Sequence, residues 1–131
     1  MQLAMLMISA GLLFVPPIST GWASQYAPGV MDKVIVNRQA WDQIPDEIDQ
    51  YDGFVAGRYP DEIGKAVWIR PVGTDEWELF LVVDCAGIAD GGLAWMKRSG
   101  VLYEVDYQTA VRWDTVGRGI KIEVMSSNIG G

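Results

Sequence analysis

Short apolar runs separated by Gly, Pro and Asp make up most of this chain after its first twenty residues. Residues 65–70 (KAVWIR) and 120–124 (IKIEV) alternate polar and apolar side chains, which is typical of a strand with one buried face. Residues 33–37, 77–83 and 101–105 add three further runs of β-rich composition. The pattern predicts a small all-β domain, either a barrel or a sandwich.

The Gly, Pro and Asp residues between these runs predict how the runs connect. Residues 71–76 (PVGTDE) form a turn, so residues 65–70 and 77–83 make a hairpin. Asp106 is placed to cap a short helix over residues 107–113, because its carboxylate can accept from the first free backbone N–H groups. Residues 41–53 are rich in acidic side chains and read as a solvated loop or short helix, and residues 87–100 read as a variable loop. No internal repeat is visible.

The amino-terminal segment has a different character from the rest. Residues 3–15 are uncharged and apolar, too short to span a bilayer and suited to the core of a secretory signal peptide, although no Lys or Arg precedes them. We therefore expect a leader over 1–20, a domain over 21–125 and a polar tail over 126–131, with the domain secreted to the periplasm or cell wall. An uncleaved buried segment or an anchoring arm are the alternatives.

Composition narrows the function. The chain has 131 residues, enough for one domain, with a formal net charge of −7 and no basic stripe. That charge argues against nucleic acid and against an anionic membrane surface as partners. The absence of His and the single Cys85 exclude a thiolate zinc site and remove the commonest general base and metal ligand. We therefore expect no metal and no cofactor, and the oligomeric state stays open.

Aromatic residues are abundant, with six Trp and five Tyr. Most are expected in the core, and two or three are expected in an exposed groove, where flat rings stack on sugar faces. The candidates for contacting such a substrate are Trp22, Tyr26, Tyr59 and Trp95.

Five segments, taken in order, resemble one family. They are residues 21–26 (GWASQY), 63–69 (IGKAVWI), 82–87 (VVDCAG), 104–110 (EVDYQTA) and 119–124 (GIKIEV). Together they resemble the G-x-A-S-x-Y, L-G-T-x-V-x-V, V-x-D-[CR]-G, D-L-S-x-x-A-A and G-x-x-x-V segments of the rare lipoprotein A-like and expansin-like double-psi β-barrels. The resemblance implies that fold and a cell-wall glycan, such as peptidoglycan, as ligand.

The resemblance also implies site residues. Asp84 stands where the rare lipoprotein A branch, a group of lytic transglycosylases, has its proposed acid/base. Arg58 stands where that branch has a His, so the pattern is broken there, and Arg58 is instead a candidate for binding a substrate carboxylate. Glu104 stands where expansins have an essential Asp. Asp106 stands at the Ser that caps their helix, and it is a further candidate for binding the substrate. Ala86 displaces the glycine that follows the Asp-Cys pair.

A lytic transglycosylase needs a carboxyl group that protonates the glycosidic oxygen and then takes a proton from the sugar's own hydroxyl. Asp84 ends an apolar strand, where desolvation favours the protonated form. The sequence leaves three hypotheses open: a glycan-cleaving enzyme using Asp84 and Glu104, a non-hydrolytic glycan-binding module, and a structural component of a virion or surface assembly. Alternatively, Asp84 simply caps backbone N–H groups.

Overall fold

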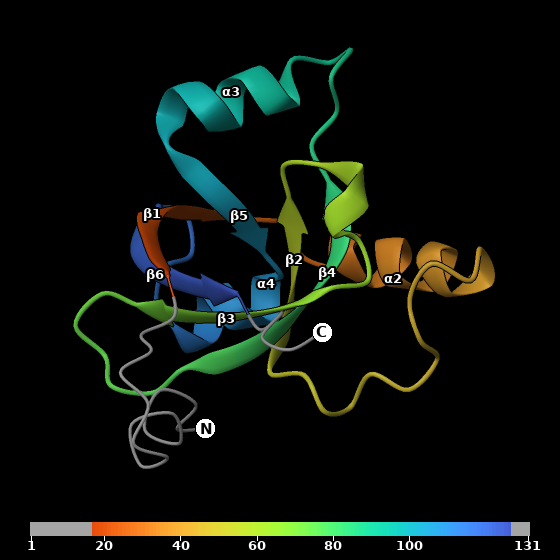
Figure 1. The fold of residues 1–131 in the computed structure, drawn as a ribbon, viewed down its shortest axis with the longest axis horizontal. Helices are drawn as coiled ribbons and strands as arrows, with labels where there is room; N and C mark the ends of the chain where they lie inside the picture. The colour runs from red at the N-terminus through yellow and green to blue at the C-terminus, as the bar shows by residue number, and fades with distance from the viewer. Residues whose placement is uncertain (1–16, 127–131) are drawn as a thin grey trace.

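The computed structural model describes residues 17–126, which form a closed six-stranded barrel with short helices (Figure 1). The strands are β1 (Ile18–Gln25), β2 (Gly53–Gly57), β3 (Ala66–Pro71), β4 (Glu78–Cys85), β5 (Val101–Val105) and β6 (Ile120–Ser126). The helices are α2 (Val30–Ala40), the 3-10 turn η1 (Pro60–Glu62), α3 (Gly92–Ser99) and α4 (Tyr107–Arg112). The described residues are mostly β-sheet, in agreement with the predicted all-β class. No helix in this part of the chain is long and apolar enough to cross a bilayer.

The barrel has an internal two-fold repeat in its strand pairing. The ring order is β1-β5-β2-β4-β3-β6. β1 pairs in parallel with β5 and antiparallel with β6, while β4 pairs in parallel with β2 and antiparallel with β3. Exchanging β1, β2, β3 for β4, β5, β6 therefore reproduces the ring. The two halves interlock where β2 meets β5 antiparallel, at Val55↔Val105 and Ala56↔Glu104.

Four of the predicted strands are confirmed, and two of them form the predicted hairpin. β3 and β4 form the expected antiparallel pair, and β5 and β6 lie where the runs 101–105 and 120–124 predict them. Their inward side chains form a core with Phe80, Ile69 and Ile122 fully buried. Asp106 caps α4 as predicted, accepting from the backbone N–H of Thr109 at 3.2 Å.

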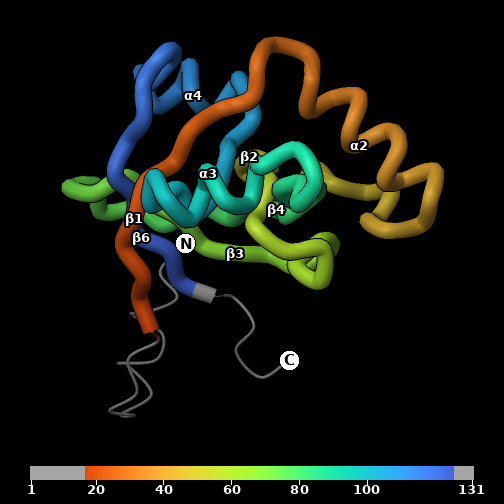
Figure 2. The backbone as a smooth tube through the Cα atoms, turned by 90° about the horizontal axis from the view of Figure 1, so that it is seen from above, coloured from red at the N-terminus to blue at the C-terminus, as the bar shows by residue number. Residues whose placement is uncertain are grey.

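The two crossing strands β2 and β5 lead into different structures at opposite ends of the barrel. Since they run antiparallel, the chain leaves β5 at one end into α4 and leaves β2 at the other end into η1. α4 fills its end, because Ala110 and Trp113 pack into the core and the Trp113 ring meets Phe80 edge-on at 5.7 Å. Figure 2 shows α4 at the upper edge of the view, on the side of the barrel away from β3. η1 is only three residues long and cannot fill the other end.

The run over residues 33–37 is helical, which corrects its interpretation as part of the β pattern. It lies inside α2, where Met31 and Ile35 are buried four residues apart, one helical turn. They pack with Leu81 and Val83 of β4 on the outside of the barrel. The β-branched run Val34-Ile35-Val36 mimics a strand, yet Val36 is exposed, so only the helical face is buried.

Four further elements were not predicted: β1, β2, η1 and α3. β2 escapes a pattern search because it is short and glycine-bounded; a Cβ on Gly53 would come within 2.5 Å of the Phe80 ring, so the close packing requires glycine there. α3 lies within the predicted loop 87–100 and is anchored by buried Met96.

The ends of the domain differ in detail from the predicted boundaries. Most of the predicted leader (1–20) and tail (126–131) lies outside the described residues. β1 already begins at Ile18, which pairs with Met125 of β6, and Thr20 pairs with Glu123. Three residues assigned to the leader are thus part of the barrel wall.

Candidate functional site

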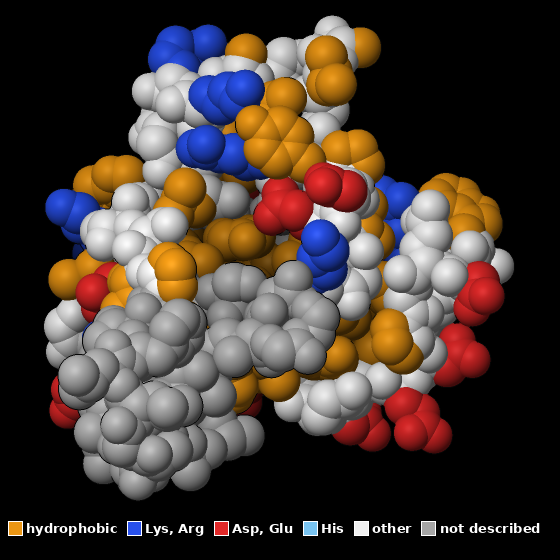
Figure 3. Space-filling view, viewed as in Figure 1, with side chains coloured by type: hydrophobic (Ala, Val, Ile, Leu, Met, Phe, Trp, Pro, Cys, Tyr) orange, Lys and Arg blue, Asp and Glu red, His pale blue; other side chains and the backbone are white. Residues whose placement is uncertain are grey.

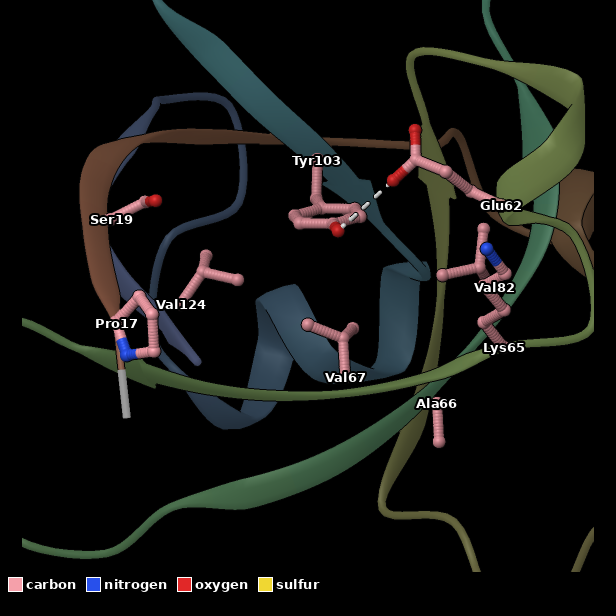
Figure 4. Close-up of a pocket in the computed structure, with 9 residues that line it drawn as sticks. All are labelled: Pro17, Ser19, Glu62, Lys65, Ala66, Val67, Val82, Tyr103 and Val124. Atoms are coloured by element: carbon pink, nitrogen blue, oxygen red, sulfur yellow. Dashed lines mark hydrogen bonds between the residues drawn. The ribbon is translucent and has the colours of Figure 1, made fainter. Parts of the chain in front are cut away.

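The end of the barrel that α4 does not fill contains a cavity of about 370 Å³, which we call the mouth cavity (Figure 4). Val67, Val82 and Val124 form its apolar walls, and Tyr103 and Glu62 project across it from opposite sides. A smaller cavity of about 210 Å³ adjoins it and shares Ser19, Glu62, Tyr103 and Val124. The two make one groove between the β5 side and the η1 side of the opening.

Glu62 is the polar centre of this groove. One carboxylate oxygen accepts from the backbone N–H groups of Arg58 (3.1 Å) and Tyr59 (3.0 Å). The other accepts from the phenol of Tyr103 at 3.2 Å. Burial, followed by the charge of Glu62, raises the pKa of Tyr103 above its ordinary value, so the phenol stays protonated and donates. The rim therefore offers a fixed hydroxyl–carboxylate pair over an apolar floor.

Aromatic and cationic side chains lie at the rim. Tyr59, which lines the smaller cavity, is 42% exposed, and the Lys97 ammonium of α3 lies 5.6 Å from its ring centroid. Figure 3 looks into this end: hydrophobic side chains line a hollow, with Lys and Arg side chains over α3 and Asp and Glu side chains over η1. A sugar face can stack on an exposed ring of this kind.

Arg58 lies at this end but does not contact Asp84. Its guanidinium donates to the carbonyls of Val101 (2.9 and 3.0 Å) and Met96 (3.3 Å). The side chain thus ties the end of β2 to the junction of α3 and β5, across the groove. Arg58 also lines the smaller cavity, although its Nε and Nη2 groups already donate to backbone carbonyls.

Asp84 lies in a separate cluster. One of its oxygens accepts from the Arg38 guanidinium at 2.8 Å and from the Cys85 N–H at 2.9 Å, and the other accepts from the Tyr26 phenol at 2.7 Å. The Arg38 and Asp84 side chains are 19% and 20% exposed. The structure thus places two predicted site residues, Tyr26 and Asp84, in contact. They belong to a hydrogen-bonded cluster that joins α2 to β4 through Arg38. Asp84 lines neither cavity of the mouth.

Glu104 lies near this cluster, because Glu104 and Asp84 both pair with Ala56 of β2, one from each side. Ser24 donates to its carboxylate at 3.1 Å. Burial raises the pKa of Glu104, the Ser24 hydrogen bond opposes this, and the charge of Asp84 adds to the rise. Two carboxylates in unlike surroundings therefore lie on either side of one strand.

The remaining predicted site residues are dispersed. Trp22 on β1 and Trp95 on α3 are 44% and 40% exposed, and neither lines the mouth. Asp106 is 5% exposed and accepts from Phe54 N, Thr109 N and the Thr109 hydroxyl, so a ligand cannot reach it without displacing α4.

Sequence reasoning missed Arg38, Glu62, Lys65 and Tyr103. Glu62 had a usable signal, because Pro60 followed by Glu two residues later is typical of a helical first turn with a capping carboxylate. Arg38 had none, since its partner Asp84 is 46 residues away.

No protein-family model matches the chain, and no curated protein matches it. Within residues 17–126, His, Cys, Asp and Glu side chains do not gather in groups of three that could hold a metal ion.

Proposed function

We propose that this protein binds a cell-wall glycan in the groove at the mouth of the barrel. One observation carries the proposal: within residues 17–126, the end opposite α4 holds a cavity, with exposed Tyr59 at its rim and the Tyr103–Glu62 pair across it. An apolar floor with a few fixed polar groups is the usual composition of a small-molecule or sugar site. Stacking would hold the sugar ring, and the pair would orient its hydroxyls.

We further infer that the barrel is of the double-psi kind. The supporting observation is the two-fold pairing, in which β1 and β4 each have one parallel and one antiparallel neighbour. The five resembling segments fall in this frame: V-V-D-C-A-G ends β4, and E-V-D-Y-Q-T-A carries the chain from β5 into α4.

Binding without cleavage is the better-supported form of this function. An acid catalyst must give up a proton, and Asp84 accepts three hydrogen bonds, one of them from a cation. These contacts engage both carboxylate oxygens and account for Asp84 as a structural link between α2 and β4. Arg58, the residue at the His position of the family, contacts backbone instead of Asp84.

Cleavage is the second candidate, with the two carboxylates in exchanged roles. The raised pKa of Glu104 suits a proton donor, and the Asp84 side chain across β2 would stabilise positive charge that develops on the sugar. Glu104 would protonate the glycosidic oxygen as its bond to C1 breaks, and the leaving sugar would depart as an alcohol with that proton. Glu104 would then take the proton of the remaining sugar's own hydroxyl as that oxygen bonds to C1 and closes the anhydro ring.

The experiment incubates the full chain with peptidoglycan and with cellulose, separates bound from soluble protein, and analyses soluble glycans by mass spectrometry. Retention without new fragments is the expected result. Anhydro-ended fragments from the native chain, lost in Glu104→Gln and in Asp84→Asn, would replace binding by cleavage. If the chain is not retained and no fragments appear, both binding and cleavage are excluded for these polymers, and an assembly role is favoured. An extracytoplasmic location, predicted from the leader, belongs to the same proposal.

A further inference from the structure

We propose that the groove at the mouth of the barrel selects an acidic glycan, one that carries carboxylates on its sugars or on their substituents, through the ammonium groups of Lys65 and Lys97. This inference rests on the glycan-binding function proposed above and names the chemistry of its ligand.

The charge at the mouth is opposite to that of the whole chain. The protein carries a formal net charge of −7, yet the charged residues lining the two cavities are Arg58, Lys65 and Glu62. Glu62 is occupied by three internal donors, two backbone N–H groups and the Tyr103 phenol. What the cavity offers to a ligand's charged group is therefore cationic.

Lys65 is the cation best placed for this. It follows η1 directly before β3, is exposed, and lines the larger cavity beside Glu62 and Val82 (Figure 4). Among residues 17–126 all three ion pairs are made by arginines, Arg38, Arg70 and Arg112, so the Lys65 ammonium has no carboxylate partner there.

Lys97 supplies a second positive charge at the other side of the groove. Its ammonium lies over the Tyr59 ring. A sugar stacked beside that ring would bring a carboxylate carried by that sugar or its substituent within reach of an ammonium group. Lysine is a flexible point charge, so it can follow a carboxylate at several positions along a polymer.

The test measures retention of the full chain on three probes: peptidoglycan, the same peptidoglycan with its carboxylates coupled to glycinamide, and cellulose. Variants Lys65→Gln and Lys97→Gln are compared with Lys33→Gln, which removes an equal charge from α2, away from the mouth. Because these lysines are exposed, each contact is worth a modest amount, and we expect about three- to fivefold weaker binding for Lys65→Gln and about as much after amidation of the polymer.

The outcomes separate the two proposals. Stronger retention on untreated peptidoglycan, reduced by Lys65→Gln and unchanged by Lys33→Gln, supports acidic selection. Equal retention on untreated and amidated polymer, preference for cellulose, or equal loss in Lys33→Gln overturns it and leaves glycan binding standing. Retention on none of the three probes removes glycan binding itself.

Discussion

The two ends of this barrel occupy equivalent places in its two-fold pairing, yet one is closed and the other is open. After β5 the chain forms α4, whose Trp113 and Ala110 complete the core. After β2 it forms only η1, and a cavity of about 370 Å³ remains. The residues that follow the two strands differ accordingly: Asp106 reaches back to Phe54 at the start of β2, and Arg58 reaches across to Val101 at the start of β5. At one of two topologically equivalent ends the chain therefore completes the core, and at the other it leaves space for a ligand.

The largest expected effect is on the closed end. Trp113→Ala removes the ring that packs on Phe80 and the indole N–H that donates to Glu78, and should lower the free energy of unfolding by about 3 kcal/mol. Urea unfolding measures this. Trp95→Ala, at an exposed position of α3, is the control and should change stability by less than about 0.5 kcal/mol. Similar losses of unfolding free energy in both variants would contradict the conclusion that α4 closes this end of the barrel.

The second-largest effect is expected for Asp106, which caps α4 at the closed end. Asp106→Ala leaves Phe54 N–H and the first turn of α4 without their acceptor in a buried place, and should cost about 2 kcal/mol. Glycan retention per folded molecule should be unchanged. A specific loss of binding with normal stability would instead restore Asp106 to the ligand site.

The open end should show the reverse pattern. Tyr59→Ala should weaken glycan retention roughly tenfold, about 1.4 kcal/mol, while the unfolding transition hardly moves, because the ring is largely exposed. The matched control is Tyr107→Ala, since Tyr107 follows Asp106 as Tyr59 follows Arg58. Loss of binding in the Tyr107 variant alone would place the ligand at the α4 end.

The smallest effect concerns Glu104, on the strand shared by both ends. Burial raises its pKa in the folded state above the ordinary value of 4.5, so the folded protein binds a proton more readily than the unfolded chain. The stability contributed by the protonated form is present at low pH and is lost gradually as pH rises above about 4.5. Glu104→Gln should not show this loss, so unfolding curves of the two proteins should diverge as pH rises. Parallel curves would mean that Glu104 is solvated.

The sequence predicts those features that depend on near neighbours along the chain. Alternation locates β3 and β6, and an Asp before a helix locates the cap of α4. The internal two-fold repeat cannot be detected in the sequence because it is a property of the strand pairing. Equivalent positions in the two halves hold unlike residues, such as Arg58 and Asp106. The candidate site is predicted in part: Tyr59 and Arg58 lie at the mouth, whereas Asp84 is engaged by Arg38, which only the folded chain brings near.

Pairing of the first strand with the last has a consequence for how this protein is made. Gly21 of β1 faces Ile122 of β6, so the wall cannot close until almost the whole domain has left the ribosome. Contacts so distant in sequence carry a large loop-closure entropy and favour slow folding. During synthesis the edge of β1 that pairs with β6 therefore stays unpaired until β6 emerges, and an unpaired strand edge is open to association with other chains.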